Sequence, residues 1–172
     1  MAFRFNESEL QQINTLLARY PSKMSATLPL LHMVQRREGW VSPDAIEEVA
    51  RLLELTRIHV ADVVSFYTMY HRKPIGKHLV SVCRTLCCQL VGQEDLSAYL
   101  RQRFSLADDH VATDPSGTFT VEHVECLGAC GAGPVVIIDG QYHERVTVQQ
   151  LGELLDSLQA AAGHSREAQG NG

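Results

Sequence analysis

The sequence lacks any long apolar run. No stretch approaches the roughly 18 residues that a membrane span needs, and the first ten residues, MAFRFNESEL, have neither the apolar core of a secretory signal nor the arginine content of a transit peptide. Of the 172 residues, 45% are hydrophobic and 20% are charged, as in soluble globular proteins. We therefore expect a cytosolic protein without direct membrane insertion, with room for one ordinary domain or two small ones.

Motifs for nucleotide binding and for histidine-based metal sites are also missing. The eight histidines form no HxxH or HExxH pattern, and no Walker A sequence occurs. The glycines at 128, 131 and 133 are followed by Pro134 and an expected strand, whereas a dinucleotide-binding loop opens a helix. The chain therefore shows no site for NAD or flavin and no catalytic residue.

Basic side chains are scarce in the second half of the chain. Residues 1–76 carry nine Lys/Arg and eight Asp/Glu, whereas residues 77–172 carry six and twelve. Nucleic-acid affinity depends on clustered Lys/Arg, so we do not expect a nucleic-acid partner. The acidic half is better suited to a basic surface of a protein partner.

The first half predicts four helices. Ser42 is a typical N-cap, with Pro43 in the first helical position, and apolar residues recur with helical spacing throughout. The expected helices run from about Leu10 to Tyr20, from Ser25 or Thr27 to Gly39, from Pro43 to about Leu53, and from after Thr56 to about Tyr70. In the last of them, Phe66, Tyr67 and Tyr70 either pack within the helical bundle, which is the simpler interpretation, or form an interface patch.

After the Pro74–Gly76 break, the pattern indicates an α+β module. The polar residues 108–117 predict a loop, the Asp139-Gly140 pair predicts a hairpin, and Thr147 with Gln150 predicts a helix start. From Ala161 onward the chain is small and polar, which predicts a disordered tail. The expected elements are strands over residues 78–82, 118–124, 135–138 and 141–146, a helix between Cys88 and Phe104, and a closing helix with its stripe from Val148 to Leu158.

Four of the five cysteines form two pairs at expected strand ends. Four residues separate Cys83 from Cys88, and three separate Cys126 from Cys130. Four thiolates, two on each iron, suit a [2Fe–2S] cluster. The small residues of the segment 128–133 let backbone N–H groups approach sulfur, and Leu86, Leu90 and Leu127 can form an apolar rim that limits water.

The residues alone leave other interpretations open. The spacings also fall within the range of structural zinc sites, although CxxC pairs are absent, and unliganded or redox thiols remain an alternative. An odd count in a reducing compartment argues against a disulfide framework. Cys87 is interpreted as a spare residue beside Cys88, with an alternative ligand or redox thiol as the second interpretation. His78 and His123 lie near Cys83 and Cys126, but the paired Cys/His motifs of Rieske centres are absent.

Three segments resemble a known family. These are Val64-Ser65-Phe66-Tyr67, Val82-Cys83-Arg84-Thr85-Leu86-Cys87-Cys88, and Glu125-Cys126-Leu127-Gly128-Ala129-Cys130-Gly131-Ala132-Gly133-Pro134. They look like the small thioredoxin-like [2Fe–2S] subunit of respiratory complex I, the E-type subunit of NADH-quinone oxidoreductase, to which the mitochondrial flavoprotein 2 homologues belong. The resemblance runs from about Leu10 to Leu158. It departs at Cys87, where Pro or Ser is common.

The resemblance implies an N-terminal helical bundle over residues 1–76, a thioredoxin-like [2Fe–2S] ferredoxin domain over residues 77–160, and a tail over residues 161–172. The implied ligands of its one cluster are Cys83, Cys88, Cys126 and Cys130. The implied partner is a larger flavoprotein subunit, which holds FMN and the NADH site, within the peripheral arm of a membrane-bound complex on its cytoplasmic side.

The function that this resemblance implies is electron transfer within the NADH-oxidising module of a proton-pumping NADH:quinone oxidoreductase. The isolated chain is then expected not to turn over NADH. The equivalent subunit of an NAD-linked hydrogenase or formate dehydrogenase is the alternative, because a fold does not choose among them. We also expect the N-terminal helices to dock onto the flavoprotein.

Overall fold

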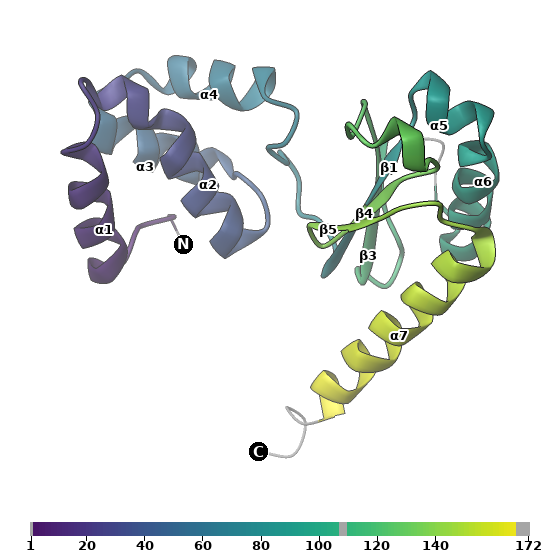
Figure 1. The fold of residues 1–172 in the computed structure, drawn as a ribbon. Coiled ribbons are helices and arrows are strands. Elements are labelled where there is room, and N and C mark those ends of the chain that lie inside the picture. The colour runs from purple at the N-terminus through teal and green to yellow at the C-terminus, as the bar shows by residue number, and fades with distance from the viewer. Residues whose placement is uncertain (1, 107–109, 168–172) are drawn as a thin grey trace. The chain divides into compact units, whose positions relative to one another are not determined.

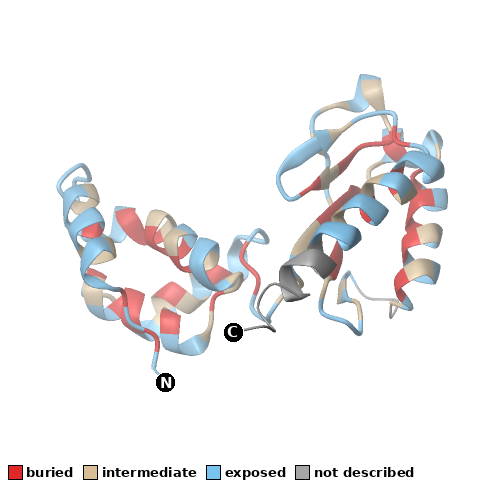
Figure 2. Ribbon diagram, turned by 90° about the horizontal axis from the view of Figure 1, so that it is seen from below, coloured by how far each residue is buried: buried red, intermediate tan, exposed pale blue. Residues whose placement is uncertain are grey.

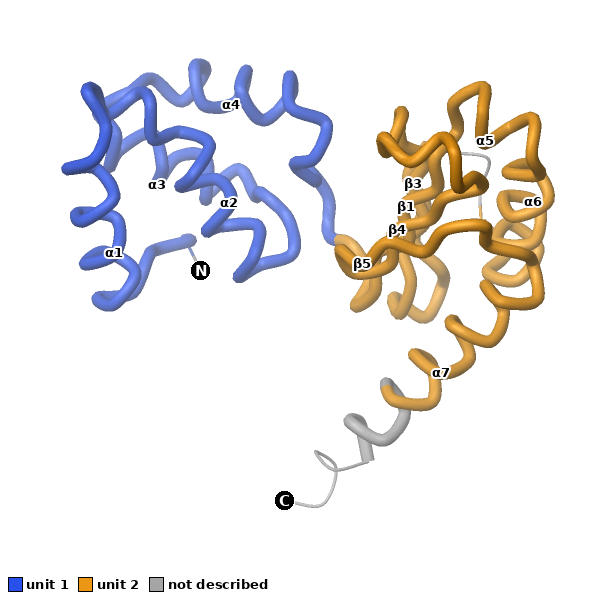
Figure 3. The backbone as a smooth tube through the Cα atoms, viewed as in Figure 1, with its two compact units in different colours: residues 1–74 blue, residues 75–172 orange. Residues whose placement is uncertain are grey.

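The computed structural model describes residues 2–106 and 110–167. The chain divides into two compact units, residues 1–74 and residues 75–172 (Figure 3). The division follows Pro74, in the segment where helical periodicity gives way to strand periodicity. Each unit has its own hydrophobic core.

Unit 1 is helical, and local signals mark the ends of its helices. The Asn6 side chain accepts a hydrogen bond from the Glu9 N–H at 2.9 Å, and the Glu9 carboxylate accepts one from the Asn6 N–H at 2.8 Å. Ser42 caps its helix through the Ala45 N–H at 3.1 Å. The elements are α1 (Glu7–Leu17), the 3₁₀ helix η1 (Lys23–Ala26), α2 (Thr27–Glu38), α3 (Pro43–Leu53) and α4 (Arg57–Phe66) (Figure 1).

The helices of unit 1 bury one apolar face each. Figure 2 shows the buried residues on the sides of these helices that face one another. Non-directional burial of this kind is the main favourable term in folding. The core is built by Ile13, Leu30, Leu31, Val34, Val49, Leu53, Val60 and Val64.

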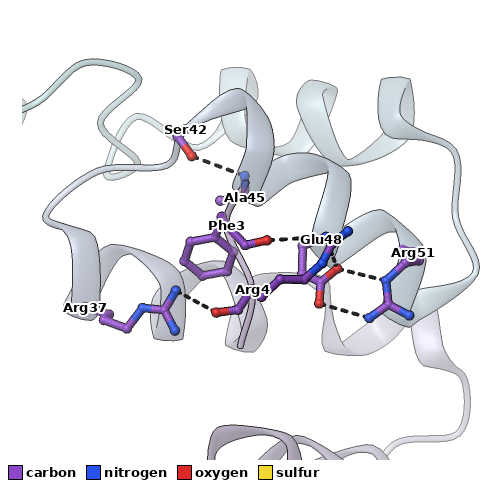
Figure 4. A network of polar contacts seen from close by, with 7 residues as sticks. All are labelled: Phe3, Arg4, Arg37, Ser42, Ala45, Glu48 and Arg51. Carbon is purple, nitrogen blue, oxygen red and sulfur yellow. Dashed lines mark hydrogen bonds and ion pairs between the residues drawn. The ribbon is translucent and has the colours of Figure 1, made fainter. Parts of the chain in front are cut away.

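A buried carboxylate ties the N-terminal segment to α3. Glu48 is 1% exposed and accepts hydrogen bonds from Arg51 at 2.8 and 2.9 Å and from Arg4 at 2.7 Å (Figure 4). Arg37 donates to the Arg4 carbonyl at 3.0 Å, and its guanidinium carbon lies 4.0 Å from the centre of the Phe3 ring. Residues 3–6 are thereby fixed onto the bundle without belonging to any helix.

The fourth helix is shorter than the sequence predicts. It ends at Phe66, and Tyr67 already has extended backbone angles, because β-branched and aromatic residues have modest helix propensity. Tyr70 lies beyond the helix but is buried, and its hydroxyl donates to the Leu28 carbonyl at 3.0 Å. The interpretation that these residues pack within the helical bundle therefore holds for Tyr70. Phe66, in contrast, is 77% exposed.

Unit 2 contains a five-stranded sheet in the order β2-β3-β1-β4-β5. The central pair, β1 and β3, is parallel, with Cys83 opposite Val124, and the other neighbouring pairs are antiparallel. The strands are β1 (His78–Cys83), β2 (Val111–Thr113), β3 (Phe119–Val124), β4 (Val136–Ile138) and β5 (Gln141–His143). The expected combination of N-terminal helices with an α+β module is confirmed.

Helices α6 (Gln93–Phe104) and α7 (Val148–Glu167) pack on the same side of the sheet (Figure 1). Val80 and Val82 of β1 point into this layer, together with Leu100 of α6 and Leu155 of α7. The short helix α5 (Leu86–Leu90) lies at the end of the sheet where β1 stops. This core leaves the carboxyl ends of β1 and β3 free to carry functional loops.

The second half differs from the sequence expectation in several places. Gly92, at φ 104°, splits the expected helix between Cys88 and Phe104 into α5 and α6. The expected polar loop over residues 108–117 contains strand β2, which is too short to show an alternating pattern, and its residues 108 and 109 lie outside the described residues. The last strand ends at His143 rather than at Val146.

Helix α7 runs from Val148 to Glu167, past the end of its predicted apolar stripe. The tail expected over residues 161–172 stays a prediction, and residues 168–172 lie outside the described part of the chain. Thr147 and Gln150 form the predicted helix start, with backbone-to-side-chain hydrogen bonds of 3.0 and 3.2 Å.

Candidate metal centre

The four paired cysteines lie at one end of unit 2. Cys83 is the last residue of β1, and Cys126 follows the end of β3 by two residues. Because β1 and β3 are parallel and adjacent, their carboxyl ends meet at the same edge of the sheet. Cys88 lies in α5, after β1, and Cys130 opens the short 3₁₀ helix η2 (Cys130–Ala132), after β3. The two sequence pairs are thus brought to one place.

The second pair is compact and exposed. The Sγ atoms of Cys126 and Cys130 are 3.6 Å apart, and the Gly128 N–H donates to Cys126 Sγ at 3.4 Å. That N–H lowers the pKa of the Cys126 thiol, and the Cys130 thiol adds to the effect. Hydrogen bonding to Cys126 raises the pKa of Cys130 to about 11. Gly128, at φ 79°, adopts a left-handed conformation that glycine accommodates without strain.

The first pair is buried. Cys83 and Cys88 are each 1% exposed, and Val135, Leu127 and Ala129 pack against them. Burial raises the pKa of Cys83, but hydrogen bonds from Thr85 and the Leu127 backbone outweigh it and lower this pKa overall. Burial also raises the pKa of Cys88, and its contact with the Cys83 thiol raises it further.

A backbone N–H and a side-chain hydroxyl lie beside two of these sulfurs. Thr85 Oγ1 lies 3.3 Å from Cys83 Sγ, and a Cβ atom at Gly133 would lie 3.5 Å from Cys88 Sγ. Hydrogen bonds to sulfur and solvent exposure are the factors by which a protein tunes an iron–sulfur cluster. Within the segment 128–133, the Gly128 N–H reaches a sulfur and Gly133 passes close to Cys88, whereas a Cβ atom at Gly131 would meet no neighbour.

The four proposed ligands approach one another in pairs. Among residues 2–106 and 110–167, no three Cys, His, Asp or Glu side chains converge closely enough to hold a single metal ion. A structural zinc site needs four ligands around one point. A [2Fe–2S] cluster likewise takes four thiolates, two on each iron.

The other cysteine and the histidines have separate roles. Cys87 is exposed and, after Cys126, contributes to the raised pKa of the Cys130 thiol. His78 Nδ1 lies 2.7 Å from the Asp139 carboxylate, and His123 Nε2 lies 2.8 Å from Ser97 Oγ. Both histidines are thus engaged away from the thiols.

The expected apolar rim is only partly present. Leu127 packs against the buried pair, whereas Leu86 and Leu90 turn their side chains to solvent, with exposures of 67% and 76%. Helix α5 buries Cys88, its central residue. Leu86 and Leu90 lie two positions before and after Cys88, so their side chains point to the opposite, outward face of the helix.

Sequence reasoning missed several residues that support the centre. Arg84 donates from Nε at 3.0 Å and from Nη2 at 2.6 Å to the Glu125 carboxylate, which links the loops after β1 and β3. The Tyr142 hydroxyl donates to the Leu127 carbonyl at 3.2 Å. Arg84 follows Cys83 and Glu125 precedes Cys126, so the sequence already showed opposite charges beside the first cysteine of each pair. No sequence pattern indicated Tyr142.

Comparison with known families places this geometry among iron–sulfur proteins. Residues 13–159 match the family described as thioredoxin-like [2Fe–2S] ferredoxin. NADH-quinone oxidoreductase subunit 2 of Thermus thermophilus is 40% identical over 159 residues, which cover 91% of this chain and 87% of the relative. An E-type NADH-quinone oxidoreductase subunit of Rickettsia bellii is 36% identical over 159 residues, covering 91% of this chain and 94% of the relative.

A solved structure shares the fold. An NAD⁺-reducing [NiFe]-hydrogenase in the air-oxidised state aligns with a TM-score of 0.68 and 19% sequence identity. The alignment covers 79% of this chain but only 23% of that hydrogenase chain. This likeness is one of fold, because the identity is low.

Proposed function

This chain belongs to the thioredoxin-like [2Fe–2S] ferredoxin family, and from that premise we propose that it is the electron-transfer subunit of the NADH-oxidising module of an NADH:quinone oxidoreductase. Its one [2Fe–2S] cluster exchanges electrons with the FMN of a partner flavoprotein subunit. The observation that carries the proposal is the meeting of both cysteine pairs at the carboxyl ends of β1 and β3, in a chain 36–40% identical to NADH-quinone oxidoreductase subunits over most of its length.

In this proposal Cys83, Cys88, Cys126 and Cys130 are the ligands. The cluster supplies one-electron chemistry when bound. Thr85 and the Gly128 N–H donate hydrogen bonds to the sulfurs of Cys83 and Cys126, which offsets the negative charge on those thiolates. Val135 and Leu127 exclude water from the buried pair, whereas Cys126 and Cys130 lie at the surface, from which an electron can enter or leave.

The flavin and NADH sites belong to the partner in this proposal. The sequence of this chain contains neither a Walker A motif nor a dinucleotide-binding loop that opens a helix. The subunit then contributes to an oxidoreductase and translocase as one electron carrier, so we expect no oxidation of NADH by the purified chain alone. Robust turnover by the isolated protein would contradict this assignment.

In the same proposal the chain lies in the peripheral arm of the complex, on the cytoplasmic side. Among the described residues, no helix is both long enough and apolar enough to cross a bilayer. The subunit names of the relatives support membership of a multi-subunit assembly.

The proposal is tested first by EPR spectroscopy of the anaerobically purified protein, before and after reduction with dithionite. We expect an S = 1/2 signal that appears on reduction, with about two irons and about two sulfides per chain. A silent sample that contains zinc and no sulfide would overturn the electron-transfer function while leaving the fold intact.

The equivalent diaphorase subunit of an NAD-linked hydrogenase or formate dehydrogenase is a second candidate. The fold shared with an NAD⁺-reducing [NiFe]-hydrogenase favours keeping it. Proteins that copurify with the chain discriminate between the two: membrane subunits support the quinone reductase, and a nickel–iron or molybdenum subunit supports the alternative.

A further inference from the structure

Cys126 and Cys130, which we call the exposed pair, have the geometry of a dithiol that can close into a disulfide. Their Sγ atoms lie 3.6 Å apart, and both residues are exposed. A disulfide brings two sulfurs to about 2.0 Å, so a modest turn of the side chains joins them. A Cβ atom at Gly128, between them, would meet nothing within 4 Å, so the loop has room for that adjustment.

The other cysteines are less suited to forming a disulfide with an external reagent. Cys83 and Cys88 are each 1% exposed, so a reagent in solution does not reach them. Cys87 is exposed, but Cys88 is its neighbour in the sequence. Consecutive Cα atoms are about 3.8 Å apart, which is less than the roughly 4.4–6.8 Å that disulfides usually span. The exposed pair is therefore the preferred place for oxidation.

The two sulfurs of the exposed pair differ in their surroundings, which suggests the order in which they react. Thiol–disulfide exchange begins when a thiolate attacks a disulfide sulfur. The Gly128 N–H donates to Cys126 Sγ at 3.4 Å, so Cys126 is expected to attack first and Cys130 second. The final disulfide is the same whichever sulfur attacks first.

We propose that the cluster-free chain carries out thiol–disulfide exchange at the exposed pair, with a low-molecular-weight disulfide as its oxidant. Cys126 attacks one sulfur of the reagent, whose S–S bond breaks; a first thiol is released and a mixed disulfide remains on Cys126. Cys130, 3.6 Å away, then attacks Cys126 Sγ and releases a second thiol. The chain loses two electrons to the reagent, and both thiol protons leave with the released thiols.

The reaction acts as a redox gate on the proposed metal centre. A metal ligand must be a thiolate, and the disulfide withholds two of the four proposed ligands. The buried pair stays reduced, so a reductant that reopens the exposed pair restores all four. Only this gating rests on the ligand assignment, because the exchange itself needs the exposed pair alone.

The test uses the full-length chain, freed of iron under anaerobic conditions and incubated with oxidised glutathione. The remaining thiols are alkylated, and peptide mass spectrometry then locates every disulfide and every glutathione adduct. Cys126→Ser and Cys130→Ser each remove one member of the exposed pair, and Cys87→Ser is the matched control, since it replaces another exposed cysteine. Cd²⁺ serves as the probe ion for thiolate ligands, because it is soft and its thiolate complexes absorb in the ultraviolet.

We expect the wild type and Cys87→Ser to form the Cys126–Cys130 disulfide and to retain no glutathione. Cys130→Ser should stop at a glutathione adduct on Cys126, because the resolving sulfur is gone. Cys126→Ser should form no disulfide to Cys130. The oxidised wild type should lose most of its Cd²⁺ absorption until a phosphine reduces the disulfide.

A stable glutathione adduct on Cys126 of the wild type, with Cys130 still open to alkylation, would overturn the proposal. A disulfide between Cys87 and Cys130, or loss of closure in Cys87→Ser, would overturn it as well. Unchanged Cd²⁺ binding by the oxidised chain would reject the gate. The disulfide map is made on the wild type, so it decides the question even where a serine variant does not fold. None of these measurements involves the flavoprotein or the reduced cluster, so their failure leaves the proposed function to its own EPR test.

Discussion

At the scale of single residues, each cysteine can be distinguished by what surrounds its sulfur. Cys83 and Cys88 are enclosed by apolar side chains, Cys126 accepts a backbone hydrogen bond, and Cys87 is exposed. Cys87 and Cys88 are adjacent, so they provide a matched pair in which only one thiol faces the buried site.

We expect Cys88→Ser to lose the [2Fe–2S] cluster and Cys87→Ser to keep it. A serine hydroxyl is a poor substitute for a thiolate toward iron, and Cys88 is the buried member of the pair. The measurement is iron and sulfide content with EPR on both variants after identical purification. Equal loss of iron from the two variants would contradict the ligand assignment.

Glu48 gives a second prediction at this scale. Its hydrogen bonds with Arg51, and its attraction to Arg51 and Arg4, hold the pKa of the carboxyl below its usual value despite burial. Glu48→Gln should lower the free energy of unfolding by about 1–3 kcal/mol, the usual cost of losing charge-assisted hydrogen bonds at a buried group. The two arginines are more than half exposed, so water can solvate them in the variant.

The pH dependence follows from the direction of that pKa. The pKa of Glu48 is lower in the folded than in the unfolded chain, so its stabilisation is present above the unfolded value, 4.5, and is lost as the pH falls through the folded value. Thermal unfolding between pH 7 and pH 3 should therefore show a shallower loss of stability in Glu48→Gln than in the wild type. Parallel acid limbs would show that Glu48 does not contribute in this way.

At the scale of elements, the crossing of α6 and α7 depends on one glycine. A Cβ atom at Gly152 would lie 2.9 Å from the Tyr99 hydroxyl, which itself accepts a hydrogen bond from Arg103 at 2.7 Å. Gly152→Ala should therefore destabilise unit 2 by about 1–3 kcal/mol through overpacking, although alanine is the better helix former.

The loss of stability in Gly152→Ala is measured by denaturant unfolding. The same substitution is then measured in a Tyr99→Phe background. Removing the hydroxyl takes away the clashing atom, so Gly152→Ala should cost less stability in the Tyr99→Phe background than in the wild type. A gain of stability in the single variant would show that the two helices separate without cost.

Most of the elements could be predicted from the sequence because their ends carry local signals. Ser42 and Thr56 begin α3 and α4 with side chains that accept backbone hydrogen bonds, as their residue types suggest. Gly39 ends α2 in a left-handed conformation. Strand β2 and the end of α4 were not predictable, since a three-residue edge strand has no detectable period and the aromatic segment after Val63 suits either structure.

For the candidate site, the sequence proposes a set of ligands but does not predict their environment. Spacing paired the cysteines, and the parallel pairing of β1 and β3 explains why the pairs meet. Which pair is buried depends on contacts between distant segments, such as Leu127 and Val135 against Cys83 and Cys88. The outward direction of Leu86 and Leu90 likewise depends on which face of α5 packs inward, and a five-residue helix gives too short a pattern to predict it.

At the scale of the whole molecule, the two units have separate cores, and we expect them to have separable roles. A chain lacking residues 1–74 should still bind its cluster, because all four proposed ligands and their supporting residues lie in unit 2. It should no longer copurify with the flavoprotein, since we expect the N-terminal helices to dock onto that subunit. The exposed Phe66 side chain on α4 is a feature that such a contact can use.

EPR of the shortened chain and affinity copurification from cells that express the partner are the two measurements. A retained S = 1/2 signal with lost copurification supports the division of roles. Intact copurification would count against docking by unit 1, and loss of the signal would show that unit 2 needs unit 1 in order to assemble its site.

The unequal burial of the two cysteine pairs also makes them differ in access to reagents. Leu127, from the loop that holds Cys126 and Cys130, and Val135 pack over Cys83 and Cys88, whereas Cys126 and Cys130 are exposed. In the cluster-free chain an alkylating reagent should therefore modify Cys126 and Cys130 before Cys83 and Cys88.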